Sequence, residues 1–153
     1  MFFVATCPRA HYSGAMPPDM SAELPESSEQ SFDFRAILLV DDDRQLASTL
    51  QWILADQNYL VDVAYDGQDA LAKVKENQYD AVVCDVMMPR LRGDQFFKEA
   101  VAARPALADR FIFITGYAAD PQINLFLAKT GAKYLMKPFP VQRLIDCVQQ
   151  LLR

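Results

Sequence analysis

Polar residues that could do chemistry together follow four separate apolar runs in this chain of 153 residues. Three consecutive aspartates, residues 41–43, follow Ile-Leu-Leu-Val, and Asp85 follows Ala-Val-Val-Cys. Thr115 ends the run Phe-Ile-Phe-Ile-Thr, and Lys137 follows Tyr-Leu-Met. Clustered carboxylates suit Mg²⁺, a hard cation that takes few protein ligands and keeps several waters. With a neighbouring ammonium and hydroxyl, this set predicts phosphoryl transfer in which Asp85 is the carboxylate nucleophile.

The elements that must bring these residues together are short apolar runs separated by amphipathic stretches. Expected strands cover residues 36–40, 60–64, 81–84, 111–115 and 133–136, and expected helices cover 44–57, 67–77, 94–103, 121–130 and 141–152. Strands that are apolar throughout and alternate with helices are typical of a parallel sheet covered on both faces. We therefore predict an α/β fold, a doubly wound (βα)5 domain with a five-stranded parallel sheet. Ligands of such sheets bind outside the carboxyl ends of the strands.

The composition predicts one folded domain preceded by an arm. Residues 1–33 contain four prolines and a polar, serine-rich run without lasting periodicity, so we expect a flexible arm there and a folded domain over 34–153. A net charge of −5 disfavours non-specific binding to nucleic acid or to an anionic membrane, and no apolar run could span a bilayer. The three cysteines form neither a zinc pattern nor a disulfide framework, so we expect a cytoplasmic protein.

Four motifs of the chain resemble the receiver domain of two-component response regulators. They are ILLVDDD, YDAVVCDVMMPRLRGD, FIFITG and AKYLMKPF, in the family's order and with its spacing. The resemblance implies the flavodoxin-like receiver fold and a phosphoprotein that assists its own phosphorylation rather than an enzyme. The last third of the chain is also similar to receivers at the C-termini of hybrid sensor kinases, which suggests a single-domain receiver in a phosphorelay.

The resemblance implies a role for each matched residue around the carboxylates. Asp85 would accept a phosphoryl group from a histidine kinase or a histidine phosphotransfer protein. Mg²⁺ would be held by Asp42 directly, by Asp41 through water, by Asp85, and by the backbone carbonyl of Met87. Met88, Pro89 and Gly93 match the loop that follows the phosphorylation site in this family.

Other matched residues would carry the response to phosphorylation. Lys137 would neutralise the phosphoryl group, and the Lys137–Pro138 bond would be cis. Thr115 and Tyr134 match the switch residues of the family. Because no output module follows the last expected helix, we expect output through contact with an unknown downstream protein. The fourth helix, fifth strand and fifth helix would form that face, and a homodimer could use it too.

The residues also allow other interpretations. Asp41 and Asp43 imitate the Asp-x-Asp of haloacid-dehalogenase-like phosphohydrolases, but no C-terminal acidic pair or substrate cap accompanies them. A receiver-like binding module that is never phosphorylated is a further alternative, although all the acceptor residues are present. Asp43 could cap the next helix or contact a partner, and Cys84 is expected to be a small core residue.

Three positions near Asp85 would affect transfer of the phosphoryl group from its donor and its later hydrolysis. Gly116 would leave room for a donor imidazole beside Asp85. Met87 and Tyr117 lie two residues beyond Asp85 and Thr115, and neither side chain could orient a hydrolytic water. We therefore expect slow autodephosphorylation.

Overall fold

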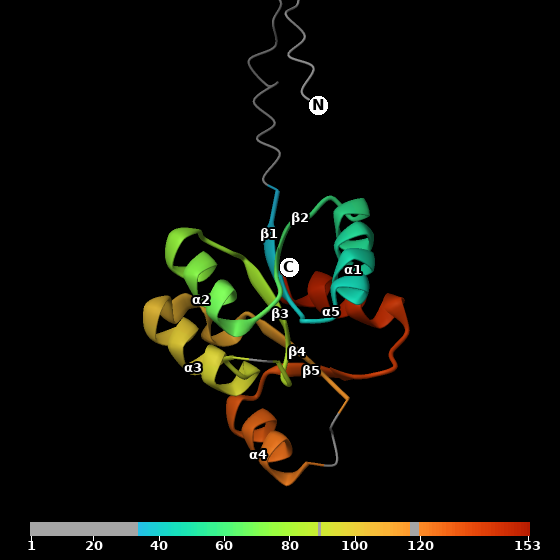
Figure 1. Ribbon diagram of the computed structural model, residues 1–153. Helices are drawn as coiled ribbons and strands as arrows, with labels where there is room; N and C mark the ends of the chain where they lie inside the picture. Colours follow the sequence, from blue (N-terminus) through green and yellow to red (C-terminus); the bar gives the residue numbers. More distant parts are fainter. Residues whose placement is uncertain (1–33, 89, 117–119) are drawn as a thin grey trace, which may run out of the picture. The chain divides into compact units, whose positions relative to one another are not determined.

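The structure is a computed structural model that describes residues 34–88, 90–116 and 120–153. The arm expected over residues 1–33 lies outside the described residues, whereas Phe34–Arg153 forms one compact unit. Strands and helices alternate along this unit (Figure 1). The strands are β1 (Ala36–Val40), β2 (Leu60–Ala64), β3 (Ala81–Asp85), β4 (Phe111–Thr115) and β5 (Lys133–Met136). The helices are α1 (Arg44–Asp56), α2 (Gly67–Glu76), α3 (Gly93–Ala103), the short 3₁₀ helix η3 (Pro105–Asp109), α4 (Pro121–Thr130) and α5 (Val141–Leu151).

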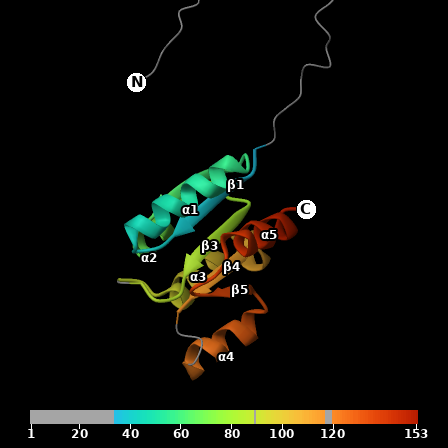
Figure 2. The same cartoon turned by 90° about the vertical axis from the view of Figure 1, so that its right-hand side faces the viewer.

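The five strands form one parallel sheet in the order β2-β1-β3-β4-β5, which confirms the predicted doubly wound fold. Helices α1 and α5 cover one face, and α2, α3 and α4 cover the other (Figures 1 and 2). The central strands β3 and β4 are buried along their whole length, as their continuous apolar runs predicted. Each face therefore has its own apolar core, and the chain direction places every strand's carboxyl end at the same edge.

Helix boundaries agree with the predicted ranges to within about a residue, and aspartate caps set the starts of α1, α2 and α4. Asp43 begins α1: its side chain accepts hydrogen bonds from the backbone N–H groups of Gln45 and Leu46, both at 3.1 Å. Asp66 and Asp120 begin α2 and α4 in the same way. Of the two roles left open for Asp43, the structure therefore shows the helix cap.

One strand runs a residue further than predicted. The expected third strand stops at Cys84, but β3 includes Asp85, which pairs with Ile114 of β4. The backbone N–H of Val86 also donates to the Ile114 carbonyl at 3.0 Å. The backbone of Asp85 is thus fixed by the sheet.

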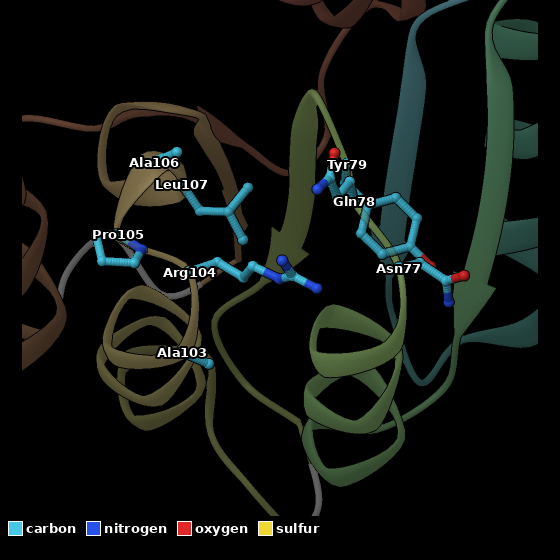
Figure 3. Close-up of a pocket in the computed structure, with 8 residues that line it drawn as sticks. All are labelled: Asn77, Gln78, Tyr79, Ala103, Arg104, Pro105, Ala106 and Leu107. Carbon is cyan, nitrogen blue, oxygen red and sulfur yellow. The ribbon is translucent and has the colours of Figure 1, made fainter.

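A cavity of about 360 Å³ lies at the opposite edge of the sheet, before β3 and β4 begin (Figure 3). Arg104 is its charged lining residue, and its side chain extends from the end of α3 toward α2 (Figure 3). The guanidinium donates from Nε to the Val74 carbonyl at 3.1 Å and from Nη2 to the Lys75 carbonyl at 3.2 Å. Those carbonyls belong to the last turn of α2, so Arg104 ties α2 to α3 and its role here is structural.

Candidate functional site

The polar residues singled out in the sequence converge at the carboxyl edge of the sheet. Asp41 follows β1, Asp85 ends β3, and these two strands are neighbours. One carboxylate oxygen from each of Asp41, Asp42 and Asp85 lies within 4.8 Å of the other two. Thr115 ends β4, the next strand, and its carbonyl accepts a hydrogen bond from the backbone N–H of Lys137 at 2.9 Å. The parallel topology thus assembles residues that are far apart in the sequence.

Asp41 is fully buried, and its two carboxylate oxygens have different surroundings. Oδ1 accepts a hydrogen bond from the Asp43 backbone N–H at 2.9 Å. Oδ2 is buried without a hydrogen-bond partner and lies 3.6 Å from the Lys137 ammonium nitrogen. A buried carboxylate oxygen that lacks a hydrogen bond is costly, so the site fits a cation that would coordinate it.

The electrostatics of the site disfavour the ionised form of Asp41. The pKa of Asp41 is raised to about 6, chiefly by burial, and the charge of Asp85 adds to this effect. The hydrogen bond from the Asp43 backbone and the ammonium of Lys137 offset only part of it. A divalent cation bound by these carboxylates would favour their ionised forms.

Lys137 reaches the Asp85 carboxylate directly. Its Nζ atom lies 3.0 Å from Asp85 Oδ2, and the Lys137–Pro138 peptide bond is cis, as the resemblance implied. Partial burial alone would lower the pKa of Lys137, but the hydrogen bond and charge of Asp85, with the charge of Asp41, raise it above its ordinary value. Lys137 is therefore a fixed positive charge beside Asp85.

The loop after β3 orients the second oxygen of Asp85. The Met87 backbone N–H donates to Asp85 Oδ1 at 3.1 Å, and the Met87 side chain is exposed. Gly93 begins α3 against this strand end, where a Cβ atom would lie 2.7 Å from the Asp85 carbonyl oxygen and 2.8 Å from Val86 Cα. The sequence placed Gly93 in the matched loop but assigned it no role. The structure shows that the close approach of α3 to the end of β3 requires a glycine there.

The other predicted residues differ in how far they are buried. Thr115 is fully buried, whereas Tyr134 is half exposed on β5 rather than packed in the core. A Cβ atom at Gly116 would meet no heavy atom within 4 Å, so this position is open. Cys84 is a buried core residue, and burial raises the pKa of its thiol well above the ordinary range. Pro89 and Tyr117 lie outside the described residues.

Comparison with known proteins identifies the family. The family model described as the response regulator receiver domain matches residues 37–149. The chain belongs to the response regulator receiver domain family. It is 35% identical over 116 residues to the transcriptional regulatory protein ZraR of Salmonella typhimurium, a match that covers 76% of this chain and 26% of ZraR. This chain thus spans only about a quarter of the length of that relative.

Solved receiver structures agree with this membership. A CheY-like receiver from Methanospirillum hungatei matches with a TM-score of 0.72 and 28% identity, covering 78% of this chain and 94% of that one. The receiver domain of the sensor histidine kinase PA1611 from Pseudomonas aeruginosa matches with a TM-score of 0.69 and 26% identity, covering 78% and 98%. That receiver was crystallised with a magnesium ion coordinated in its active site cleft.

This family membership gives the chain's general function. Receivers act in phosphorelay signalling, accept phosphoryl groups rather than work as enzymes in the usual sense, and have a histidine kinase as partner. The cluster of Asp41, Asp42 and Asp85 is typical of a receiver magnesium site. The phosphohydrolase alternative is therefore wrong. Within the described ranges, no helix is long and apolar enough to cross a membrane.

Proposed function

We propose that Asp85 is the phosphoacceptor of this receiver and that residues 34–153 form the receiver domain. The observation that carries the proposal is the position of Lys137, whose ammonium nitrogen lies 3.0 Å from Asp85 Oδ2 inside a cluster of carboxylates. An ammonium held there offsets the charge of incoming phosphoryl oxygens, which is the main requirement of phosphoryl transfer.

The transfer forms one bond and breaks one. A carboxylate oxygen of Asp85 attacks phosphorus, the bond from phosphorus to the donor's imidazole nitrogen breaks, and its electron pair stays on that nitrogen. Asp85 Oδ1 is held by the Met87 N–H and Oδ2 by Lys137, so the carboxylate is oriented before the donor arrives. Buried Thr115 supplies a hydroxyl at the end of the neighbouring strand for a phosphoryl oxygen.

We further propose that Mg²⁺ is held by Asp41, Asp42, Asp85 and the backbone carbonyl of Met87. The cation would supply neutralisation of the phosphoryl oxygens during transfer. Support comes from the buried Oδ2 atom of Asp41, which accepts no hydrogen bond. The magnesium ion in the PA1611 receiver is consistent with this assignment.

A downstream protein would recognise the phosphorylated state at the face formed by α4, β5 and α5. Tyr134 and Met136 on β5 are about half exposed, and Val141 at the start of α5 is 39% exposed. We propose that movement of Thr115 and Tyr134 on phosphorylation changes this face, which then contacts a downstream protein. Use of the same face by a homodimer remains a prediction.

Intact-mass measurement tests the central assignment. The wild-type chain, incubated with acetyl phosphate and magnesium chloride, should gain one phosphoryl group, and excess EDTA should prevent the gain. Asp85→Asn should gain none, whereas the matched variant Asp80→Asn, on the opposite edge of the sheet, should be labelled like the wild type. An unmodified wild type, or labelling of Asp85→Asn, would overturn the proposal. Transfer from purified phosphorylated histidine kinases would then identify the donor.

A further inference from the structure

An apolar groove of about 530 Å³ lies between α3 and α4, away from the phosphoacceptor. Both cartoon views place these two helices side by side (Figures 1 and 2). We call it the α3–α4 groove and define it by the residues that the argument uses: Phe97, Lys98 and Val101 of α3 and Leu125, Phe126 and Lys129 of α4. Helix α4 also borders the proposed output face, but this groove lies on its α3 side and includes no residue of β5 or α5.

The floor of the groove is rigid because it is built from packed aromatic rings. The ring centroid of Phe97 lies 5.8 Å from that of Phe126 and 4.9 Å from that of Phe111. Phe126 in turn lies 5.1 Å from Phe113, on β4. Leu125 stands beside this floor with 56% of its surface exposed. A preformed apolar surface loses little conformational entropy on binding, which favours its use as an interface.

The rim of the groove carries two lysines, one from each helix. Lys98 and Lys129 are exposed, and among the described residues neither has a carboxylate within salt-bridge distance. Asp94 also lines the groove, but it lies 3.4 Å from the Arg92 guanidinium. The two lysines therefore retain free charge beside an apolar floor. Their charge would attract an acidic partner to this groove.

We propose that the α3–α4 groove docks an amphipathic, acidic helical segment of a partner protein. Apolar side chains of that segment at helical spacing would cover Phe97, Leu125 and Phe126. Aspartates or glutamates flanking them would pair with Lys98 and Lys129. This combination of apolar anchors and complementary charge is the helix-in-groove mode of recognition. The lining of the groove includes none of Asp41, Asp42, Asp85 and Lys137, so its residues take no direct part in phosphoryl transfer.

A peptide selection tests the charge and the location together. The full chain is used as bait for a displayed library of random peptides of helix-forming composition, and fluorescence anisotropy then measures the affinity of the selected sequences. We expect them to share apolar residues at helical spacing with flanking acidic residues. The double variant Lys98→Glu/Lys129→Glu should bind the selected peptides at least about tenfold more weakly than the wild type does. Peptides whose acidic residues are replaced by lysine should bind this double variant with the affinity restored. Leu125→Ser should also weaken binding.

Controls separate this site from the other faces of the protein. The matched charge reversal Lys133→Glu/Arg143→Glu, on β5 and α5, should leave peptide affinity unchanged. Labelling by acetyl phosphate should be the same for both double variants and the wild type, so failure of the groove and failure of the phosphoacceptor assignment are distinguishable. Peptides without acidic bias, binding that survives the Lys98/Lys129 reversal, or equal loss in the control variant would each overturn the proposal. So would a dimer in sedimentation velocity that Leu125→Ser dissociates, since a second copy would then fill the groove.

Discussion

The substitution Asp41→Asn should stabilise the protein in the absence of a divalent cation. Burial raises the pKa of Asp41 from its ordinary 3.8 to about 6. Each pKa unit corresponds to about 1.4 kcal/mol, so the ionised carboxylate costs the folded state about 3 kcal/mol near neutral pH. Asparagine removes that charge, and its amide oxygen can still accept the hydrogen bond from Asp43. The amide N–H group of the asparagine side chain would be buried beside the Lys137 ammonium without an acceptor, so part of this gain is lost and we expect a net gain of about 2 kcal/mol.

The sign of the pH dependence follows from where the proton is held. Between about pH 4 and pH 6 the folded chain keeps the Asp41 proton that the unfolded chain has already lost. The folded state therefore binds more protons in this window, and the stability of the wild type falls as the pH rises through it. The gain from Asp41→Asn should accordingly be about 1.4 kcal/mol smaller at about pH 5 than at about pH 7.5.

Urea unfolding followed by circular dichroism measures these differences directly. The wild type and Asp41→Asn are compared in excess EDTA at the two pH values and again with saturating magnesium chloride. Magnesium should reduce the difference in unfolding free energy between Asp41→Asn and the wild type, because it binds and stabilises the folded wild type. The control Asp42→Asn, at an exposed carboxylate, should change stability little in EDTA while also losing the magnesium effect. A loss of stability in Asp41→Asn in EDTA, or a gain independent of pH, would refute this reasoning.

Three further predictions concern the residues around the acceptor. Gly93→Ala should cost about 3 kcal/mol in urea unfolding because its Cβ would meet the backbone at 2.7 Å, whereas Gly116→Ala should stay within about 0.5 kcal/mol of the wild type. Asp43→Ala should cost about 1 kcal/mol by removing the α1 cap, with no loss of labelling by acetyl phosphate; abolished labelling would contradict the cap role. The phosphorylated wild type should lose its phosphoryl group slowly by intact mass. Met87→Asn should speed this loss by up to about tenfold, since an amide there could orient a water.

The fold could be predicted from the sequence because its signals are local. Apolar runs such as Ile37–Val40 and capping aspartates such as Asp43 act within a few residues, so element boundaries were accurate. The convergence of Asp41, Asp85 and Lys137 was also predictable, because parallel strands must end at a common edge. Close tertiary approaches between elements could not be predicted from the sequence. The residues around Gly93 in the sequence do not predict that α3 packs against the Asp85 carbonyl.

The α3–α4 groove escaped prediction for the same reason. In the sequence, Phe97 and Phe126 are ordinary apolar helix residues. Only the tertiary contact between their rings, with centroids 5.8 Å apart, makes them the floor of one groove. Likewise, the sequence predicts only solvated surface charges at Lys98 and Lys129. The structure shows both lining one groove, without a carboxylate partner among the described residues. Sequence periodicity indicates which face of a helix is apolar, but not which neighbouring helix leaves part of that face uncovered.

The three consecutive aspartates after β1 show how position decides the effect of a residue. Asp41 is buried as the chain leaves the strand, Asp42 is exposed, and Asp43 begins the helix. The same carboxylate therefore destabilises the folded state at 41, is nearly neutral at 42, and stabilises at 43. Without magnesium, replacing Asp41 should raise the free energy of unfolding, replacing Asp42 should leave it unchanged, and replacing Asp43 should lower it. A divalent cation bound beside Asp41 would offset the cost of its buried charge, so the proposed magnesium site coincides with the least favourable charge of the three aspartates.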